Sequence, residues 1–222
     1  MRVDVDNLEP RNFDRGPVRV IKNFLPRTLF KELQKVVMGG DFPWVFCPYT
    51  VKLDYYGKKS GKVIESYTDG NFMFNHHLVK QDYSSVKKYK EVKTSGVIDQ
   101  IEPTIRSPYY KQFSKILPYI QESKPYSKLM RLKMNLYPNQ NRYIDLGKHR
   151  DIGSVDKSGK DNFDDYFIGI LHFNTCNGLT IVKNEKIKSE ENQMLLFENV
   201  EHHGTVQTDT KARIVLNFNF KK

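Results

Sequence analysis

The chain has 222 residues, of which 38% are hydrophobic and 28% charged, and its formal net charge is +10 at pH 7. This length suits a single domain with one core, and the apolar and aromatic content argues against a disordered chain. No apolar run reaches the roughly 18 to 20 residues of a membrane span, and residues 1–10 lack the apolar segment of a secretory signal, so no membrane partner is expected.

The two cysteines and the basic excess give two further expectations. Cys47 and Cys176 lie far apart without CxxC spacing, so they are interpreted as free thiols in the reducing environment of a cytoplasm. The densest basic stretch, 80–93, also contains acidic residues and is interpreted first as solvated surface. Nucleic-acid binding through this stretch is the weaker alternative.

The first half of the chain carries two helical patterns. The segment PVRVIKNFL favours a strand, and Pro26 begins a predicted helix that Gly39 and Gly40 should end. The apolar residues of this helix recur at helical spacing: Leu29, Phe30, Leu33, Val36 and Val37. A second helical pattern covers YKQFSKILPYI, which Pro118 should kink or divide.

From Met130 onward the apolar period changes to two residues, which is typical of half-buried strands. The later segments YFIGILHF, LTIVKN, QMLLFE and RIVLNFNF are short, and we expect turns between them at residues such as Asn177-Gly178. Helices followed by a run of strands predict a mainly β jelly roll or barrel with supporting N-terminal helices. We expect one domain over 1–222, with a helix-rich layer in 1–125 and the strand core in 126–222.

Two sequence elements could hold a metal ion. In GKHRDIG, His149 and Asp151 are two residues apart, so an extended backbone would direct both side chains to one face. This spacing alone is common. Near the C-terminus the pair His202-His203 precedes a strand that begins at Arg213.

That last strand has two different faces. Its core face is expected to carry Ile214, Leu216, Phe218 and Phe220, and its other face Arg213, Val215, Asn217 and Asn219. A cation and two amides facing away from the core are costly unless an anionic ligand or a carboxylate meets them. Two histidines and one carboxylate form the facial triad of non-haem iron(II) enzymes, and the planar fork of an arginine can bind a carboxylate through two hydrogen bonds.

Together, HRD, IGILHFNTCNGLTIV, QMLLFENVEHHG and KARIVLNFNF resemble the 2-oxoglutarate/iron(II) dioxygenase superfamily, in its prolyl-4-hydroxylase-like group of small phage and bacterial oxygenases. The resemblance covers roughly residues 128 to 220. It implies a double-stranded β-helix, Fe(II) as cofactor, 2-oxoglutarate and O2 as cosubstrates, and the cytoplasm of a bacterium or a phage-infected cell.

The same resemblance implies roles for individual residues. His149, Asp151 and His202 would be the catalytic metal ligands, with His203 as an alternative third ligand. Arg213 would bind the far carboxylate of 2-oxoglutarate. The further cosubstrate contacts would be Tyr137 and Asn135.

The expected reaction is hydroxylation of a C–H bond, coupled to the decarboxylation of 2-oxoglutarate to succinate. Peptidyl proline or lysine, a free amino acid, a small metabolite and a nucleobase all stay open as substrates, as does the oligomeric state. The alternative from another class is a non-catalytic jelly roll that uses a metal ion to hold a ligand. His172, inside an apolar strand, is interpreted as a core or wall residue rather than a ligand.

Overall fold

The structure is a computed structural model, and it describes residues 18–48, 50, 52–56, 63–67, 71–81, 102–152 and 162–222. Of 52–56 and 63–67 it describes only the backbone. Most of the basic stretch 80–93 lies outside these residues. Within the described ranges, no helix combines the length and the apolar character needed to cross a membrane.

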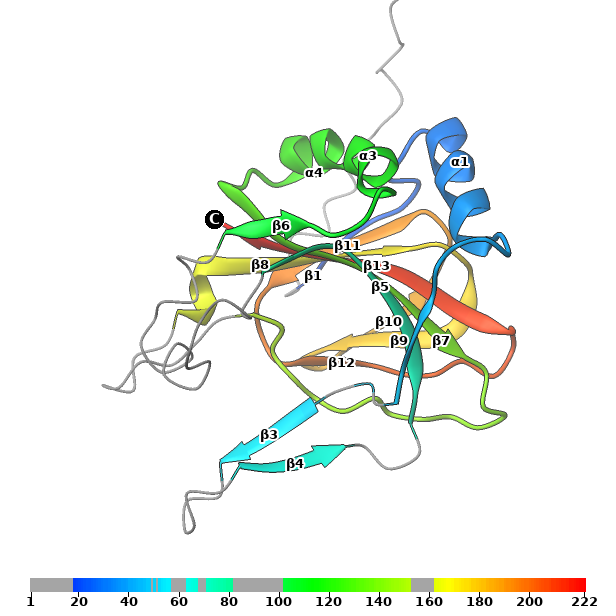
Figure 1. Cartoon of the computed structure of the whole chain (residues 1–222), viewed down its shortest axis with the longest axis vertical. Helices are drawn as coiled ribbons and strands as arrows, with labels where there is room; N and C mark the ends of the chain where they lie inside the picture. Colours follow the sequence, from blue (N-terminus) through cyan, green and yellow to red (C-terminus); the bar gives the residue numbers. More distant parts are fainter. Residues whose placement is uncertain are drawn as a thin grey trace, which may run out of the picture.

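An antiparallel major sheet forms the centre of the molecule (Figure 1). Its strands, in spatial order, are β1 (Val18–Ile21), β11 (Gln193–Glu198), β8 (Tyr166–His172), β13 (Ala212–Lys221), β7 (Lys128–Pro138), β5 (Met73–Gln81) and β2 (Val45–Cys47), and β6 (Pro103–Ile105) also pairs with β5. Four of these strands precede residue 126. The sheet therefore draws on both halves of the chain.

Two smaller sheets complete the strand inventory of the described residues. The minor sheet has the order β10 (Glu185–Ser189), β9 (Cys176–Val182) and β12 (His202–Gly204). A separate hairpin consists of β3 (Lys52–Tyr56) and β4 (Val63–Tyr67). Figure 1 shows the minor sheet facing the side of the major sheet that is opposite the helices.

The helices cover the outer face of the major sheet (Figure 1). They are α1 (Arg27–Met38), α3 (Tyr110–Phe113), the 3-10 turn η2 (Ser114–Ile116) and α4 (Leu117–Ser123), with a further 3-10 turn, η3 (Phe163–Asp165), before β8. Gly39 caps the end of α1, and Pro118 lies in the first turn of α4, so the division expected at this proline is confirmed. The core between the helices and the sheet includes Phe30, Leu33, Val37, Phe113, Ile116, Leu132, Met134, Ile214, Leu216, Phe218 and Phe220.

The opposite, inner face of the major sheet faces the minor sheet. Apolar residues from both sheets form its core: Val18, Ile168, Ile170, Val182, Leu195, Phe197 and Val215. Along β7 and β13 the inner face becomes polar, with cross-strand pairs Arg131–Asn219, Lys133–Asn217, Asn135–Val215 and Tyr137–Arg213. The mainly β fold and the two different faces of β13 are both confirmed.

The expected turn at Asn177-Gly178 is wrong, because both residues lie inside β9. A Cβ on Gly178 would approach Arg213 Cδ to 2.8 Å and the Thr205 carbonyl oxygen to 3.2 Å. The glycine therefore serves close packing against Arg213 rather than chain reversal. The chain changes direction instead at residues 173–175, between the end of β8 and the start of β9.

Candidate metal centre

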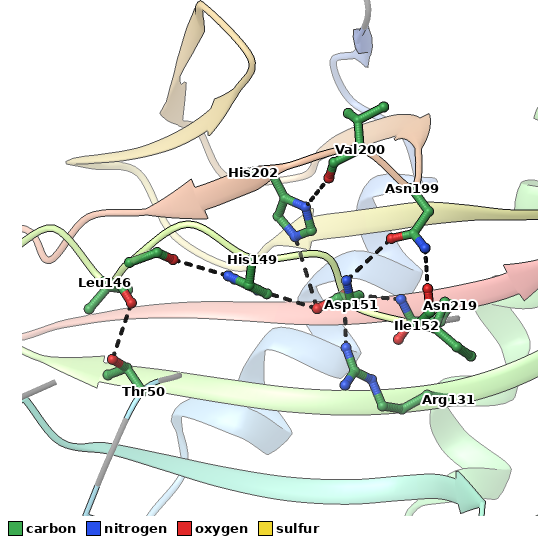
Figure 2. Close-up of polar contacts among 11 residues, drawn as sticks. Thr50, Arg131, Leu146, His149, Asp151, Ile152, Asn199, Val200, His202 and Asn219 are labelled. Carbon is green, nitrogen blue, oxygen red and sulfur yellow. Dashed lines mark hydrogen bonds and ion pairs between the residues drawn. The ribbon is translucent and has the colours of Figure 1, made fainter. Parts of the chain in front are cut away.

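Three side chains converge between the two sheets at the start of β12 (Figure 2). The backbones of His149 and His202 exchange two N–H···O=C hydrogen bonds of 2.9 and 3.0 Å, which fixes the two residues side by side. Asp151 Oδ1 lies 3.3 Å from His149 Nε2 and 4.0 Å from His202 Nε2. The three ligand atoms all lie within 4.8 Å of one another, even though His202 is far from the other two residues along the chain.

Each histidine is held in one orientation by a backbone carbonyl. His149 Nδ1 lies 3.1 Å from the Gly147 oxygen, and His202 Nδ1 lies 2.9 Å from the Val200 oxygen. Since a carbonyl can only accept, each Nδ1 carries the proton and donates it. Both Nε2 atoms are therefore left as lone-pair donors, and both are directed at Asp151 Oδ1 (Figure 2).

The second oxygen of Asp151 is held from the major sheet. Arg131 Nη2 forms an ion pair with Oδ2 at 2.8 Å, and Asn219 Nδ2 donates to Oδ2 at 3.0 Å. Asn199 accepts a hydrogen bond from the Asp151 backbone N–H at 3.2 Å and donates to the Ile152 carbonyl oxygen. These contacts leave Oδ1 free to act as a single-oxygen ligand.

The charges of the cluster suit a cation. Burial alone would raise the pKa of Asp151, but the charge of Arg131 counters it, and that pKa lies well below its ordinary value. Burial lowers the pKa of His202, which favours the neutral imidazole that a metal ion requires.

The donor set fits a divalent first-row metal ion. Two imidazole nitrogens and one carboxylate oxygen are the ligands of the facial triad, which leaves the remaining positions of an octahedral ion open. The 3.3 Å between Asp151 Oδ1 and His149 Nε2 is close to the spacing of neighbouring ligands about 2.0 to 2.2 Å from one ion, and His202 Nε2, 4.0 Å from Oδ1, would move closer on binding.

Arg213 is a buried cation, with 2% of its surface exposed. Its guanidinium donates to Ser189 Oγ at 2.8 Å, to Thr180 Oγ1 at 2.6 Å and to the Thr205 carbonyl at 3.3 Å. None of the described carboxylates forms an ion pair with it. A buried cation held only by neutral acceptors is costly, and an anionic ligand would offset that cost.

His172 supports this arginine from the neighbouring strand. Its Nδ1 lies 2.9 Å from Gln193 Oε1, and its Nε2 lies 3.5 Å from Thr180 Oγ1, which also accepts from Arg213. Burial, followed by the charge of Arg213, lowers the pKa of His172 to about 3. His172 is therefore a neutral wall residue and lies outside the metal cluster, as the sequence indicates.

Comparison with known proteins gives a likeness in structure but none in sequence. No protein-family model matches the chain, and no curated protein matches it. An oxidoreductase of the 2OG-Fe(II) oxygenase family from Burkholderia pseudomallei is 8% identical, with a TM-score of 0.56 over 92% of this chain and 85% of that one. A prolyl hydroxylase from Trichoplax adhaerens, solved with a hypoxia inducible factor peptide fragment, is 16% identical, with a TM-score of 0.52 over 94% and 84%.

The chain has the fold of the 2OG-Fe(II) oxygenases. Within this oxygenase fold, His203 lies next to the cluster in sequence but not in space. Its Nε2 contacts Asp145 Oδ2 at 3.3 Å, whereas His202 belongs to the cluster. The structure therefore favours His202 over His203.

The two further residues expected at the cosubstrate lie on the inner face of β7. Tyr137 pairs with Arg213 across the strands, and its ring centroid lies 5.8 Å from the guanidinium carbon. Asn135 is 1% exposed, and its Oδ1 has no hydrogen-bond partner among the described residues. Along β7, Asn135 therefore lies between Arg131, which contacts the metal cluster, and Tyr137, which faces Arg213.

Sequence reasoning missed the residues that orient the cluster. Arg131 and Asn199 hold Asp151, and Thr180 and Ser189 hold Arg213. Arg131 lies on the polar face of a strand with period two, so alternation could have placed it on the inner face. The other three had no signal in the sequence, because their contacts join segments that are distant along the chain.

Proposed function

We propose that the chain is an Fe(II)- and 2-oxoglutarate-dependent oxygenase that hydroxylates a C–H bond. The observation that carries the proposal is the combination, on one inner face, of a two-histidine, one-carboxylate cluster and a buried arginine without a carboxylate partner among the described residues. When bound, the metal ion would supply the activation of O2 and the chelation of the 2-oxo acid.

His149, Asp151 and His202 would hold the ion from one side. Because both Nδ1 atoms are tied to carbonyl oxygens, the rings need little reorganisation when a metal ion binds. Arg131 and Asn219 would keep Asp151 from binding through both oxygens, since they already occupy Oδ2.

Arg213 would bind the far carboxylate of 2-oxoglutarate. Its Ser189 and Thr180 contacts fix the plane of the guanidinium, and the absence of a Cβ at Gly178 and Gly204 makes room for it. A Cβ on Gly204 would lie 3.0 Å from Arg213 Nη1. The site is thus built to hold a planar cation that can pair with a carboxylate.

The test is anaerobic addition of Fe(II) and 2-oxoglutarate to the purified protein, followed by visible spectroscopy. Chelation of the 2-oxo acid should give a weak charge-transfer band, and His202→Ala should abolish it. His203→Ala is the matched control, because this neighbour lies outside the cluster, and it should retain the band.

A different outcome would separate the alternatives. Fe(II) binding without the band would favour a non-catalytic metal-binding jelly roll. Loss of the band in His203→Ala with retention in His202→Ala would reassign the third ligand. Absence of Fe(II) binding would refute the proposed function.

A further inference from the structure

Lys133 lies on the inner face of β7, between the metal cluster and the β5–β2 edge of the major sheet. It pairs with Asn217 on β13 and with His77 on β5. Within the described part of the chain, this partly buried lysine forms no hydrogen bond and no ion pair. Burial lowers the pKa of Lys133 to about 8, and the charge of Arg131 adds to that shift.

The groups around Lys133 are also without partners. Buried atoms that lack a hydrogen bond among the described residues include His77 Nδ1, Asn135 Oδ1 and Asn217 Oδ1. Each amide can rotate to present its Nδ2 donor in place of its oxygen, and the imidazole can carry its proton on Nδ1. Donors of this kind beside an ammonium group are the usual composition of an anion site, and a ligand that meets them would remove the cost of leaving them unpaired.

The charge of Lys133 has no counterpart in the proposed complex. The charges of a divalent ion and of dianionic 2-oxoglutarate cancel, and Asp151 is paired with Arg131. Among the described residues of the site, the positive charges of Arg213 and Lys133 are then left over. The site would therefore attract one further anion after metal ion and cosubstrate have bound.

We propose that Lys133 binds an anionic group of the substrate, either a carboxylate or a phosphate. The inference rests on the proposed function, because it takes the cosubstrate to occupy Arg213. Along the inner face of β7, Lys133 is one position from Arg131, which contacts Asp151, and two positions from Tyr137, which faces Arg213. This position suits a substrate that enters beside the cosubstrate.

The test is calorimetric titration of the Mn(II)-loaded, 2-oxoglutarate-saturated protein with sodium sulfate and, separately, sodium acetate. Wild type should bind at least one of these probes, and Lys133→Met should weaken that binding by about tenfold or more. Lys80→Met is the matched control, since Lys80 is exposed on β5, and it should stay within about threefold of wild type. Preference for acetate would indicate a carboxylate substrate, and preference for sulfate a phosphate-like one.

Two further readouts keep the proposal separate from other roles of the lysine. Lys133→Met should leave the 2-oxoglutarate affinity within about threefold of wild type and should not lower the melting temperature, because it removes a charge without a partner. A large loss of 2-oxoglutarate affinity would assign Lys133 to the cosubstrate, and a large loss of stability would assign it a structural role; either overturns the proposal. The proposal is also overturned if wild type binds neither anion, or if Lys133→Met binds the anion as tightly as wild type does.

Failure of the proposed function gives a different pattern. If wild type binds neither Mn(II) nor 2-oxoglutarate, the oxygenase proposal fails. Titration of metal-free wild type and metal-free Lys133→Met with the same two probes then shows whether Lys133 binds anions without the metal ion and the cosubstrate.

Discussion

Replacing Arg213 by methionine tests how the cosubstrate is held. The side chain is 2% exposed, and three of its N–H groups are already used by Ser189, Thr180 and Thr205. Two charge-assisted hydrogen bonds to a carboxylate contribute about 3 to 4 kcal/mol, so Arg213→Met should weaken 2-oxoglutarate binding by a factor on the order of 100 to 1000.

Stability should change much less than affinity. The variant loses three hydrogen bonds but also removes a buried charge that lacks a carboxylate partner among the described residues, so these terms oppose each other. We expect the free energy of unfolding to stay within about 2 kcal/mol of wild type. Calorimetric titration of the Mn(II) protein with 2-oxoglutarate measures the affinity, and urea denaturation measures the stability.

A second variant tests the same contact without removing the charge. Gly178→Ala would place a Cβ 2.8 Å from Arg213 Cδ, so the guanidinium must shift and the affinity should fall by about tenfold. The reasoning is refuted if Arg213→Met is folded and binds 2-oxoglutarate within about threefold of wild type.

Three further predictions concern the surroundings of the site. Asp151→Ala should lower the free energy of unfolding of the metal-free protein by about 1 to 3 kcal/mol, because Arg131 loses its partner; urea denaturation should show partial recovery in Asp151→Ala/Arg131→Met. Asn199→Ala should weaken Mn(II) binding by about tenfold in a metal titration, since Asn199 holds the backbone of Asp151; an unchanged affinity would show that this contact is dispensable. The pKa of His172 is about 3 in the folded protein, against 6.5 for the group in the unfolded chain. As pH falls from 6.5 toward 3, the unfolded chain therefore binds a proton that the folded protein does not, and stability is lost. Between pH 7 and pH 4.5, wild type should lose about 2 kcal/mol more stability than His172→Gln, and equal losses would contradict the buried, neutral state of His172.

Local patterns were sufficient for the helices, for the faces of β13 and for the strands β1, β7, β8, β9, β11 and β13, whereas β2 to β6, β10 and β12 were not predicted. The two-residue alternation of 213–220 separates the core residues from the inner-face residues, because successive side chains of a strand leave on opposite sides. The division of the second helix at Pro118 follows from the missing N–H of proline. Both properties depend on residues close together in the sequence.

Only the tertiary structure decides which residues meet. His149 and His202 are joined by backbone hydrogen bonds between distant segments, and this pairing distinguishes His202 from His203. At Gly178 a local pattern gives a wrong prediction: the sequence predicts a turn, but the residue lies in a strand and packs against Arg213. Sequence spacing fixes the direction of a side chain within its own element, whereas contacts between elements depend on how the sheets pack, which no short segment contains.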